Sequence, residues 1–152
     1  MRILQVFRTP VGGLFRHVGD LVRGLSDLGP EVGIVCDSTT GGGAAEKMLA
    51  DLAPSCHLGI HRLPIGRMPG LADVKAASAI ARIAATAKPD ILHGHGAKGG
   101  VYARLAGSRL KLPSLYTPHG GSLHYAWASP RGALFLTAER LMLRRGSGLV
   151  FV

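Results

Sequence analysis

Short apolar runs alternate along this chain with longer segments in which apolar residues recur at helical spacing. The short runs are rich in valine, isoleucine and leucine, and this composition is typical of parallel strands that are covered on both faces of a sheet. Six runs are therefore predicted as strands: Ile3–Phe7, Val32–Cys36, Leu58–Leu63, Ile91–His93, Pro113–Thr117 and Leu149–Val152.

Three longer segments have the pattern of helices. Apolar residues from Leu14 to Leu28 fall on one helical face, and Gly29 follows them as a C-terminal cap. A second apolar face covers Val74–Ala87. Ser129-Pro130 has the form of an N-cap followed by proline at the first helical position, which predicts a third helix that ends near Arg145.

This alternation predicts one α/β domain over residues 1–152, with a Rossmann-like, doubly wound, mostly parallel sheet and helices on both faces. In such sheets, ligands bind at the carboxyl ends of the strands. Four of these ends carry glycine pairs or triplets, in the segments TPVGG, CDSTTGGG, HGHGAKGG and TPHGG. We therefore expect a ligand site there. Because the sequence stops at an apolar strand, we also expect a truncated domain.

The net charge is strongly positive, because 18 Lys and Arg against 9 Asp and Glu give +9. Such a surface favours nucleic acids, anionic membranes or phosphorylated ligands. Aromatic residues make up only 5% and no basic run exceeds two residues, so nucleic acid is not expected as a partner. An anionic membrane stays open, with Arg140, Arg144 and Arg145 beside Leu141 and Met142 as its candidate contact.

The N-terminal segment and the cysteines favour a cytoplasmic protein. MRILQVFRTP has too short an apolar run for a signal peptide, and Arg8 and Pro10 stand where a cleavage region has small residues. No run reaches the roughly 18 apolar residues of a membrane span. Cys36 and Cys56 form no CxxC pair and are expected to be reduced structural thiols.

Gly12-Gly13 lies between the first predicted strand and the first predicted helix. Paired glycines let the backbone approach a ligand and a helix N-terminus attracts phosphate, although a plain tight turn is the alternative. The spacing is not G-x-G-x-x-G, because Phe15 and Arg16 occupy the stretch where the third glycine should fall. Asp37, at the end of the second strand, leaves an NAD site open as a less favoured alternative.

Histidines mark two of the strand ends. His93 and His95 point to the same face if the strand is extended, and with His119 they are candidates for zinc, but no clear fourth ligand follows and no metal is expected. Glycine on either side of His95 suggests a loop close to a polar ligand, whereas His93 is a candidate for a structural hydrogen bond. Lys98 lies at the start of the next helix, where the helix dipole disfavours a cation. The lysine there either pairs with a bound anion or is solvated. The other histidines are expected to be structural or exposed, and among them His17 is the best candidate for a functional residue.

Three segments in this order resemble those of retaining glycosyltransferases of the GT-B fold, family 4. They are RILQVFRTPVGGLFRHVGDLVRGLSDLGPEVGIVC, KPDILHGHGAKGGVYARLAG and LPSLYTPHGGSL. The resemblance extends from Arg2 to Val152. Pro30 departs from it, because the family usually has histidine there, and this difference affects a turn rather than the site.

In that family, two Rossmann-like domains face each other across a cleft. The N-terminal domain mainly holds the acceptor, and the C-terminal domain holds the nucleotide sugar with an E-x7-E motif. Glu31, Glu46 and Glu139 are the only glutamates here, so the motif is absent. The resemblance thus implies one half of a GT-B enzyme, the N-terminal acceptor-side domain, without its C-terminal donor-binding domain and inactive by itself.

The resemblance also implies roles for individual residues. His119 would be the catalytic residue beside the transferred sugar, where it positions the donor or stabilises developing charge. Glycines of two loops would approach the donor diphosphate and sugar: Gly12, Gly13, Gly120 and Gly121. Three further residues would line the acceptor side: His17, His95 and Lys98.

The implied reaction transfers a sugar from a nucleotide-sugar donor to a glycan, lipid-linked or small-molecule acceptor, with retention and without a metal or cofactor. The implied partners are the donor, the acceptor, the missing C-terminal domain and an anionic membrane surface for a peripheral cytoplasmic enzyme. Two other classes stay open. One is an NAD- or nucleotide-binding Rossmann module of an epimerase or dehydrogenase, and the other is a non-enzymatic basic α/β domain that docks on anionic membranes.

Overall fold

Six parallel strands form one sheet in the part of the chain described by the computed structural model, which covers residues 1–119, Thr137, Arg140 and 148–150. Their order is β3-β2-β1-β4-β5-β6. The elements are β1 (Arg2–Phe7), α1 (Gly12–Asp27), β2 (Glu31–Asp37), α2 (Gly42–Leu52), the 3-10 helix η1 (Ala53–Ser55), β3 (Ile60–Leu63), α3 (Ala72–Ala87), β4 (Ile91–His95), α4 (Gly96–Leu110), β5 (Ser114–Thr117) and β6 (Gly148–Leu149).

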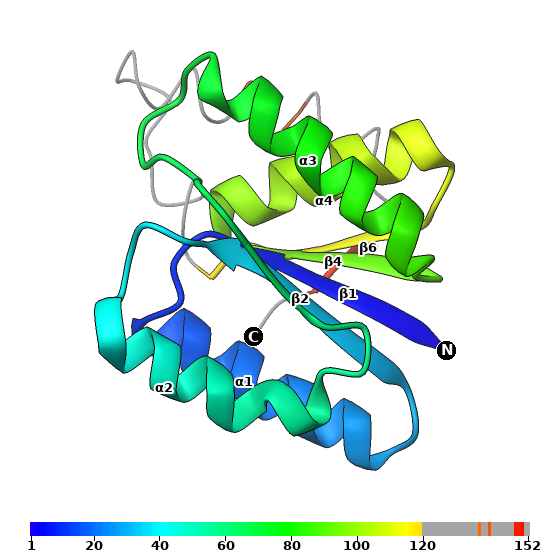
Figure 1. The fold of residues 1–152 in the computed structure, drawn as a ribbon. Coiled ribbons are helices and arrows are strands. Elements are labelled where there is room, and N and C mark those ends of the chain that lie inside the picture. The colour runs from blue at the N-terminus through cyan, green and yellow to red at the C-terminus, as the bar shows by residue number, and fades with distance from the viewer. Residues whose placement is uncertain (120–136, 138–139, 141–147, 151–152) are drawn as a thin grey trace.

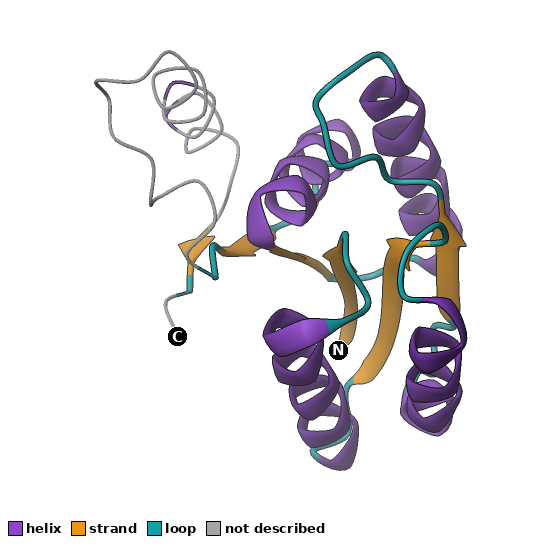
Figure 2. Ribbon diagram, turned by 90° about the vertical axis from the view of Figure 1, so that its left-hand side faces the viewer, coloured by secondary structure: helices purple, strands orange, loops and turns teal. Residues whose placement is uncertain are grey.

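The helices cover both faces of the sheet. Helices α1 and α2 lie on one face, and α3 and α4 lie on the other (Figure 1). The view along the sheet in Figure 2 shows the strands as a layer between these two pairs. The predicted Rossmann-like, doubly wound sheet is therefore confirmed, and the strand order reverses between β1 and β4.

Most predicted elements lie within two residues of the observed ones, but the region around His95 differs. Strand β4 continues through His95, and α4 begins at the next residue, Gly96. The prediction of a loop around His95 is therefore wrong. Backbone pairing with β1 extends to this position, where Phe7 lies opposite His95, and holds the segment in the sheet.

Helix α2 has no counterpart in the sequence prediction. Its buried face is short and consists of Ala45, Leu49 and Leu52. Three consecutive glycines, residues 41–43, precede and begin it, and glycine is a weak helix former. The helix is stabilised by packing of Leu49 and Leu52 in the apolar cluster that also contains Phe15 of α1.

Alternation along the strands separates two apolar clusters. Leu4 and Val6 of β1 pack in the cluster on the α3–α4 side, whereas Phe7 packs in the cluster on the α1–α2 side. The second cluster also buries Cys36 and Cys56, which are free thiols as predicted. Burial raises the pKa of Cys36 to about 12 and that of Cys56 to about 11, so both stay protonated at neutral pH.

Glycines let α4 lie directly on the sheet. A Cβ on Gly99 would stand 2.2 Å from the Val6 carbonyl oxygen, and one on Gly94 would stand 2.4 Å from the Gly99 carbonyl oxygen. A Cβ on Gly100 would meet the Tyr116 ring at 2.3 Å. These glycines therefore serve close packing between a helix and three strands.

The third predicted helix, Ser129 to about Arg145, lies outside the described residues except for Thr137 and Arg140, which are helical and exposed. Of the candidate membrane residues, Arg144, Arg145, Leu141 and Met142 also lie outside them. Among the described residues, no helix combines the length and the apolar character that crossing a membrane requires.

We expect Gly99→Ala to destabilise the fold by about 1–3 kcal/mol, because the new methyl group overlaps backbone atoms that cannot move independently. The measurement is the free energy of unfolding in urea. Gly24→Ala is the matched control, since Gly24 is exposed in α1 with open space at its Cβ, and we expect a gain of roughly 0.5–1 kcal/mol. Equal stability of the two variants would contradict the packing role of Gly99.

Candidate functional site

The candidate site lies at the carboxyl edge of the sheet, where the strand order reverses between β1 and β4. This switch point is where doubly wound sheets bind ligands. Helix α1, the end of β4 and the segment after β5 meet there. They bring together His17, His95 and His119, which offer one nitrogen each within 4.8 Å of one another.

His95 is the buried member of this group, with 1% of its surface exposed. Its Nε2 lies 2.7 Å from Oε1 of Gln5, and its Nδ1 lies 3.1 Å from Nε2 of His119. Because an amide oxygen only accepts, Nε2 of His95 carries the proton and donates it to Gln5. Nδ1 of His95 then accepts the Nε2–H of His119, so Nδ1 of His119 keeps a lone pair.

His93 lies one alternation earlier on the same face of β4, and its ring centroid is 4.0 Å from that of His95. The prediction that the two side chains share a face is confirmed. Nε2 of His93 lies 2.8 Å from the hydroxyl of Thr117 on β5. This buried contact matches the structural hydrogen bond that the sequence suggested for His93.

His17 approaches the group from α1. Its ring centroid is 4.9 Å from that of His119 and 6.1 Å from that of His95. The structure thus places His17, the best candidate among the isolated histidines, beside His95 and His119. Its function on the acceptor side stays a prediction.

Burial keeps two of these imidazoles neutral. Burial, together with a smaller contribution from the neighbouring histidines, lowers the pKa of His95 to about 2 and that of His93 to about 4. Burial and the charge of His17 also lower the pKa of His119. Near neutral pH, each of these three rings therefore offers one N–H donor and one lone pair.

The glycine pair that begins α1 lies at the surface. Gly12 and Gly13 are exposed, and a Cβ at either would meet no atom within 4 Å. Helix α1 begins at Gly12 without a side-chain cap and has no acidic residue in its first turn, so its first N–H groups are available to an anion. Gly120 and Gly121, expected in the second loop, lie outside the described residues.

Lys98 lies in the first turn of α4, but its charge is paired within the chain. Its Nζ donates to the carboxylate of Asp73 on α3 and to the Met68 carbonyl oxygen at 3.1 Å. The hydroxyl of Tyr102 donates to the same oxygen of Asp73. Burial alone raises the pKa of Asp73, but these hydrogen bonds outweigh it and hold the pKa below its usual value. The expected acceptor-side role of Lys98 stays a prediction.

Asp37 is fully buried at the end of β2, and its carboxylate accepts hydrogen bonds from other residues of this chain. Its Oδ1 accepts the backbone N–H groups of Ile65 at 2.8 Å and Thr39 at 3.1 Å, and the Thr39 hydroxyl donates to both oxygens. Burial alone would raise the pKa of Asp37, but the hydrogen bonds together hold it below its usual value. This arrangement fastens the β3–α3 segment to β2.

Gln5 is the site residue that the sequence analysis missed. It is fully buried in β1 and accepts the hydrogen bond that orients His95, from a position 90 residues earlier in the chain. The available signal was a single amide inside the apolar run Ile3–Phe7. A polar side chain at a buried strand position needs a partner, and a ligand-binding edge supplies one.

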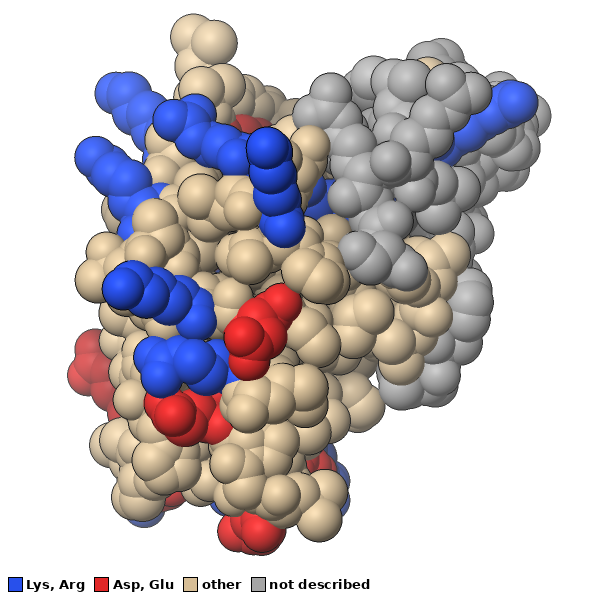
Figure 3. Space-filling view, turned by 90° about the vertical axis from the view of Figure 1, so that its right-hand side faces the viewer, with Lys and Arg blue, Asp and Glu red and all other residues tan. Residues whose placement is uncertain are grey.

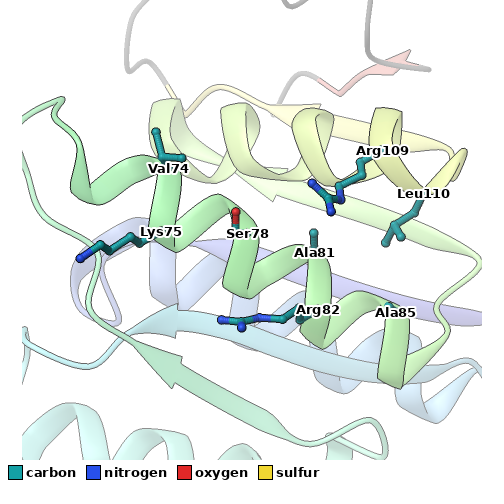
Figure 4. Close-up of a pocket in the computed structure, with 8 residues that line it drawn as sticks. All are labelled: Val74, Lys75, Ser78, Ala81, Arg82, Ala85, Arg109 and Leu110. Carbon is teal, nitrogen blue, oxygen red and sulfur yellow. The ribbon is translucent and has the colours of Figure 1, made fainter.

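A second concave surface lies on the outer side of the α3–α4 pair, away from the histidines. It is a groove of about 570 Å³ whose lining combines cations with small and apolar side chains (Figure 4). On the side drawn in Figure 3, the upper part of the molecule carries several lysine and arginine side chains and few acidic ones. The lining residues are Val74, Lys75, Ser78, Ala81, Arg82, Ala85, Arg109 and Leu110.

Comparison with known proteins shows which class this fold and site define. The family model of the glycosyl transferase 4-like domain matches residues 12–152, which is most of the chain. The chain therefore belongs to the glycosyl transferase 4-like domain family. This match confirms the resemblance drawn from the sequence motifs. No curated protein matches the chain at a significant level.

Solved structures share the fold at low sequence identity. A glycosyltransferase from Rickettsia africae is 22% identical with a TM-score of 0.67, covering 99% of this chain and 36% of its own. MurG of Acinetobacter baumannii is 18% identical with a TM-score of 0.64, covering 99% and 41%. A UDP-GlcNAc 2-epimerase from Neisseria meningitidis bound to UDP-GlcNAc is 17% identical with a TM-score of 0.67, covering 96% and 39%. The chain thus spans less than half the length of these proteins.

The buried carboxylate of Asp37 predicts a measurable pH dependence of stability. Since its folded pKa lies below that of an unfolded aspartate, about 3.9, its contribution is present above that value and is lost as the pH falls through the folded pKa. Asp37→Asn removes charge-assisted hydrogen bonds, so we expect a loss of about 1.5–3 kcal/mol at pH 7 and a flatter acid limb. Unfolding in urea between pH 7 and pH 2 measures both.

Asp51→Asn is the control for this prediction, because Asp51 is exposed on α2. We expect that variant to follow the wild-type profile closely. An Asp37→Asn protein with wild-type stability at pH 7 would show that the carboxylate contributes little to the fold.

Proposed function

We propose that this chain is the acceptor-side domain of a glycosyltransferase that moves a sugar from a nucleotide-sugar donor to a glycan, lipid-linked or small-molecule acceptor, with retention. Membership of the glycosyl transferase 4-like domain family supports transferase activity of the whole protein. The observation that carries the proposal is the convergence of three histidines with an uncapped helix N-terminus at the switch point of the sheet.

The two halves of this edge suit the two parts of a nucleotide sugar. The first N–H groups of α1, behind Gly12 and Gly13, suit the diphosphate, whose charge increases as the bond to the sugar breaks. His119 suits the sugar, because its Nδ1 lone pair can accept a hydroxyl hydrogen bond while its Nε2–H is held by His95. His119 thereby positions the donor, and His17 and His95 line the acceptor side.

This chemistry requires no metal ion, since helix N–H groups stabilise the leaving diphosphate electrostatically. It also requires no carboxylate nucleophile, since attack on the face from which the leaving group departs retains the configuration. The C-terminal domain of the same protein would supply the grip on base and ribose. Several structures of this fold support a nucleotide-sugar donor, because they are described with UDP or UDP-GlcNAc.

Asp37 argues against an NAD-binding alternative. The acid that would bind a ribose is fully buried and bonded to Ile65 and Thr39. A UDP-sugar epimerase is the stronger alternative, because structures of UDP-N-acetylglucosamine 2-epimerases share the fold. Product analysis with a panel of nucleotide sugars distinguishes an epimerase from a glycosyltransferase, since an epimerase changes the donor sugar without an acceptor.

The basic face of α3 and α4 supports a peripheral membrane location for the enzyme. The groove there is lined by Lys75, Arg82 and Arg109. At the α3 N-terminus, Met68 and Leu71 are 71% and 89% exposed. Cations beside exposed apolar side chains suit an anionic membrane that carries a lipid-linked acceptor. The contact expected at the C-terminal arginines stays a prediction, because most of that segment lies outside the described residues.

For the donor site, we expect His119→Gly to lower kcat by roughly a hundred- to thousandfold in the full-length enzyme, as for the loss of one transition-state hydrogen bond. Glycine is the sharper substitution because the backbone φ of His119 is +52°, which glycine adopts without strain, whereas His119→Ala adds a backbone penalty. The measurement is steady-state transfer with the best donor from a nucleotide-sugar panel.

The exposed His57 supplies the matched control, and His57→Ala should keep wild-type turnover. Circular dichroism and thermal unfolding establish that each variant is folded. Turnover of a folded His119→Gly enzyme within twofold of the wild type would remove His119 from the reaction.

For the membrane contact, we expect the triple variant Lys75→Gln, Arg82→Gln, Arg109→Gln to bind anionic vesicles roughly a hundredfold more weakly at low salt. Each basic side chain near such a surface contributes about 1 kcal/mol. Sedimentation with phosphatidylserine-containing vesicles measures the partition. Lys47→Gln on the exposed side of α2 is the control and should bind like the wild type. Equal binding of both variants would exclude this face.

A further inference from the structure

Three imidazoles in the candidate site converge on one point from three separate elements. His17 comes from α1, His95 from the end of β4, and His119 from the segment after β5. One nitrogen of each lies within 4.8 Å of the other two. Imidazole nitrogen is a preferred ligand of divalent zinc, copper, nickel and iron.

The most buried ligand is already oriented. Nε2 of His95 donates to Oε1 of Gln5 at 2.7 Å, which leaves Nδ1 as the nitrogen that faces His119. Histidines that bind metals almost always donate their other ring N–H to an oxygen in this way, and the bond fixes the ring orientation. Gln5 therefore holds the position that a supporting residue occupies behind a metal ligand.

The distances fit a tetrahedral ion. Two imidazoles on one zinc ion, each with a Zn–N bond of about 2.05 Å, place their nitrogens roughly 3.3 Å apart. Nδ1 of His95 and Nε2 of His119 are 3.1 Å apart, so an ion in place of their shared hydrogen requires a shift of only a few tenths of an ångström. A nitrogen of the half-buried His17 lies within 4.8 Å of the other two, so binding the same ion requires a rotation of the His17 side chain.

We propose that His17, His95 and His119 bind one divalent transition-metal ion, with zinc as the best fit, through three imidazole nitrogens. His17 and His119 are only half buried, so the fourth position is open to solvent and takes water. The binding site stands independently of the proposed function. It departs from the sequence-based expectation that this site holds no metal. Where transfer uses His119, a bound ion and the donor sugar compete for that ring.

Cobalt(II) and zinc are the probes for this site. The purified protein, without a polyhistidine tag and stripped with a chelator, is titrated with cobalt(II), whose visible absorption bands intensify in four-coordinate sites. We expect these bands to saturate at one equivalent and to disappear when zinc displaces the cobalt. Thermal unfolding followed by circular dichroism should shift to higher temperature with zinc, because an ion that binds the folded state stabilises it.

The variants locate the ion. His17→Ala and His119→Gly should each abolish the bands, and the exposed control His57→Ala should keep them. Gln5→Leu removes the acceptor behind His95 but keeps a similar volume, so we expect zinc affinity to fall by about 10- to 100-fold. Because His17 and His119 are half exposed, these two variants test the site without disturbing the core.

Three results would overturn the proposal. One is a folded wild-type protein without the cobalt bands at one equivalent. Another is a wild-type response in both folded variants, His17→Ala and His119→Gly. The third is a sulfur-to-cobalt charge-transfer band, which would place the ion on Cys36 or Cys56 instead.

Discussion

Where helix α4 begins, Gly94 of β4 and Gly99 bring its backbone into direct contact with the backbones of β1 and β4, and the geometry of the site depends on this contact. Hypothetical Cβ atoms on Gly94 and Gly99 would stand 2.2–2.4 Å from backbone carbonyl oxygens. Backbone atoms in contact leave little freedom for one element to slide on another. The contact therefore holds β1 and β4 as neighbours with Phe7 opposite His95, and it starts α4 immediately after that histidine.

On the other side of the same strands, beside the apolar cluster that contains Phe7, the sheet buries a group of polar side chains. Gln5, His93 and His95 are at most 7% exposed, and burial of polar groups is unfavourable unless they are hydrogen-bonded. His93 uses Thr117, and His95 uses Gln5. Among the described residues, Nε2 of Gln5 is buried without a partner, which costs about 1–3 kcal/mol. Apolar side chains at these positions would avoid this cost. The polar row formed by Gln5, His93 and His95 is therefore best explained by a functional requirement at the carboxyl edge of the sheet.

The sequence predicted the sheet class, the two long amphipathic helices and the strand ends, because these depend on spacing within one segment. It could not distinguish the glycines that pack from those that face open space. Gly12 and Gly13 have free space at their Cβ positions, whereas Gly94 and Gly99 contact other backbone atoms, and this difference depends on elements distant in sequence. For the same reason the Gln5–His95 bond, across 90 residues, was missed. The three histidines were all candidates, but only the fold brings them together.

The alternation of side chains along β4 places the residues that pack on the α3–α4 side and the histidines of the site on opposite faces of the sheet. Leu92 packs in the cluster on the α3–α4 side, where Gly94 contacts α4, and His93 and His95 point to the opposite face. A shift of register by one residue would bury the imidazoles against α4 and turn Leu92 toward the polar row, so both faces select the same pairing. The packing of α4 and the chemistry of the site therefore use different residues of one five-residue strand. This separation allows the histidine face to acquire a new ligand, such as a metal ion, while the glycine face keeps the fold unchanged.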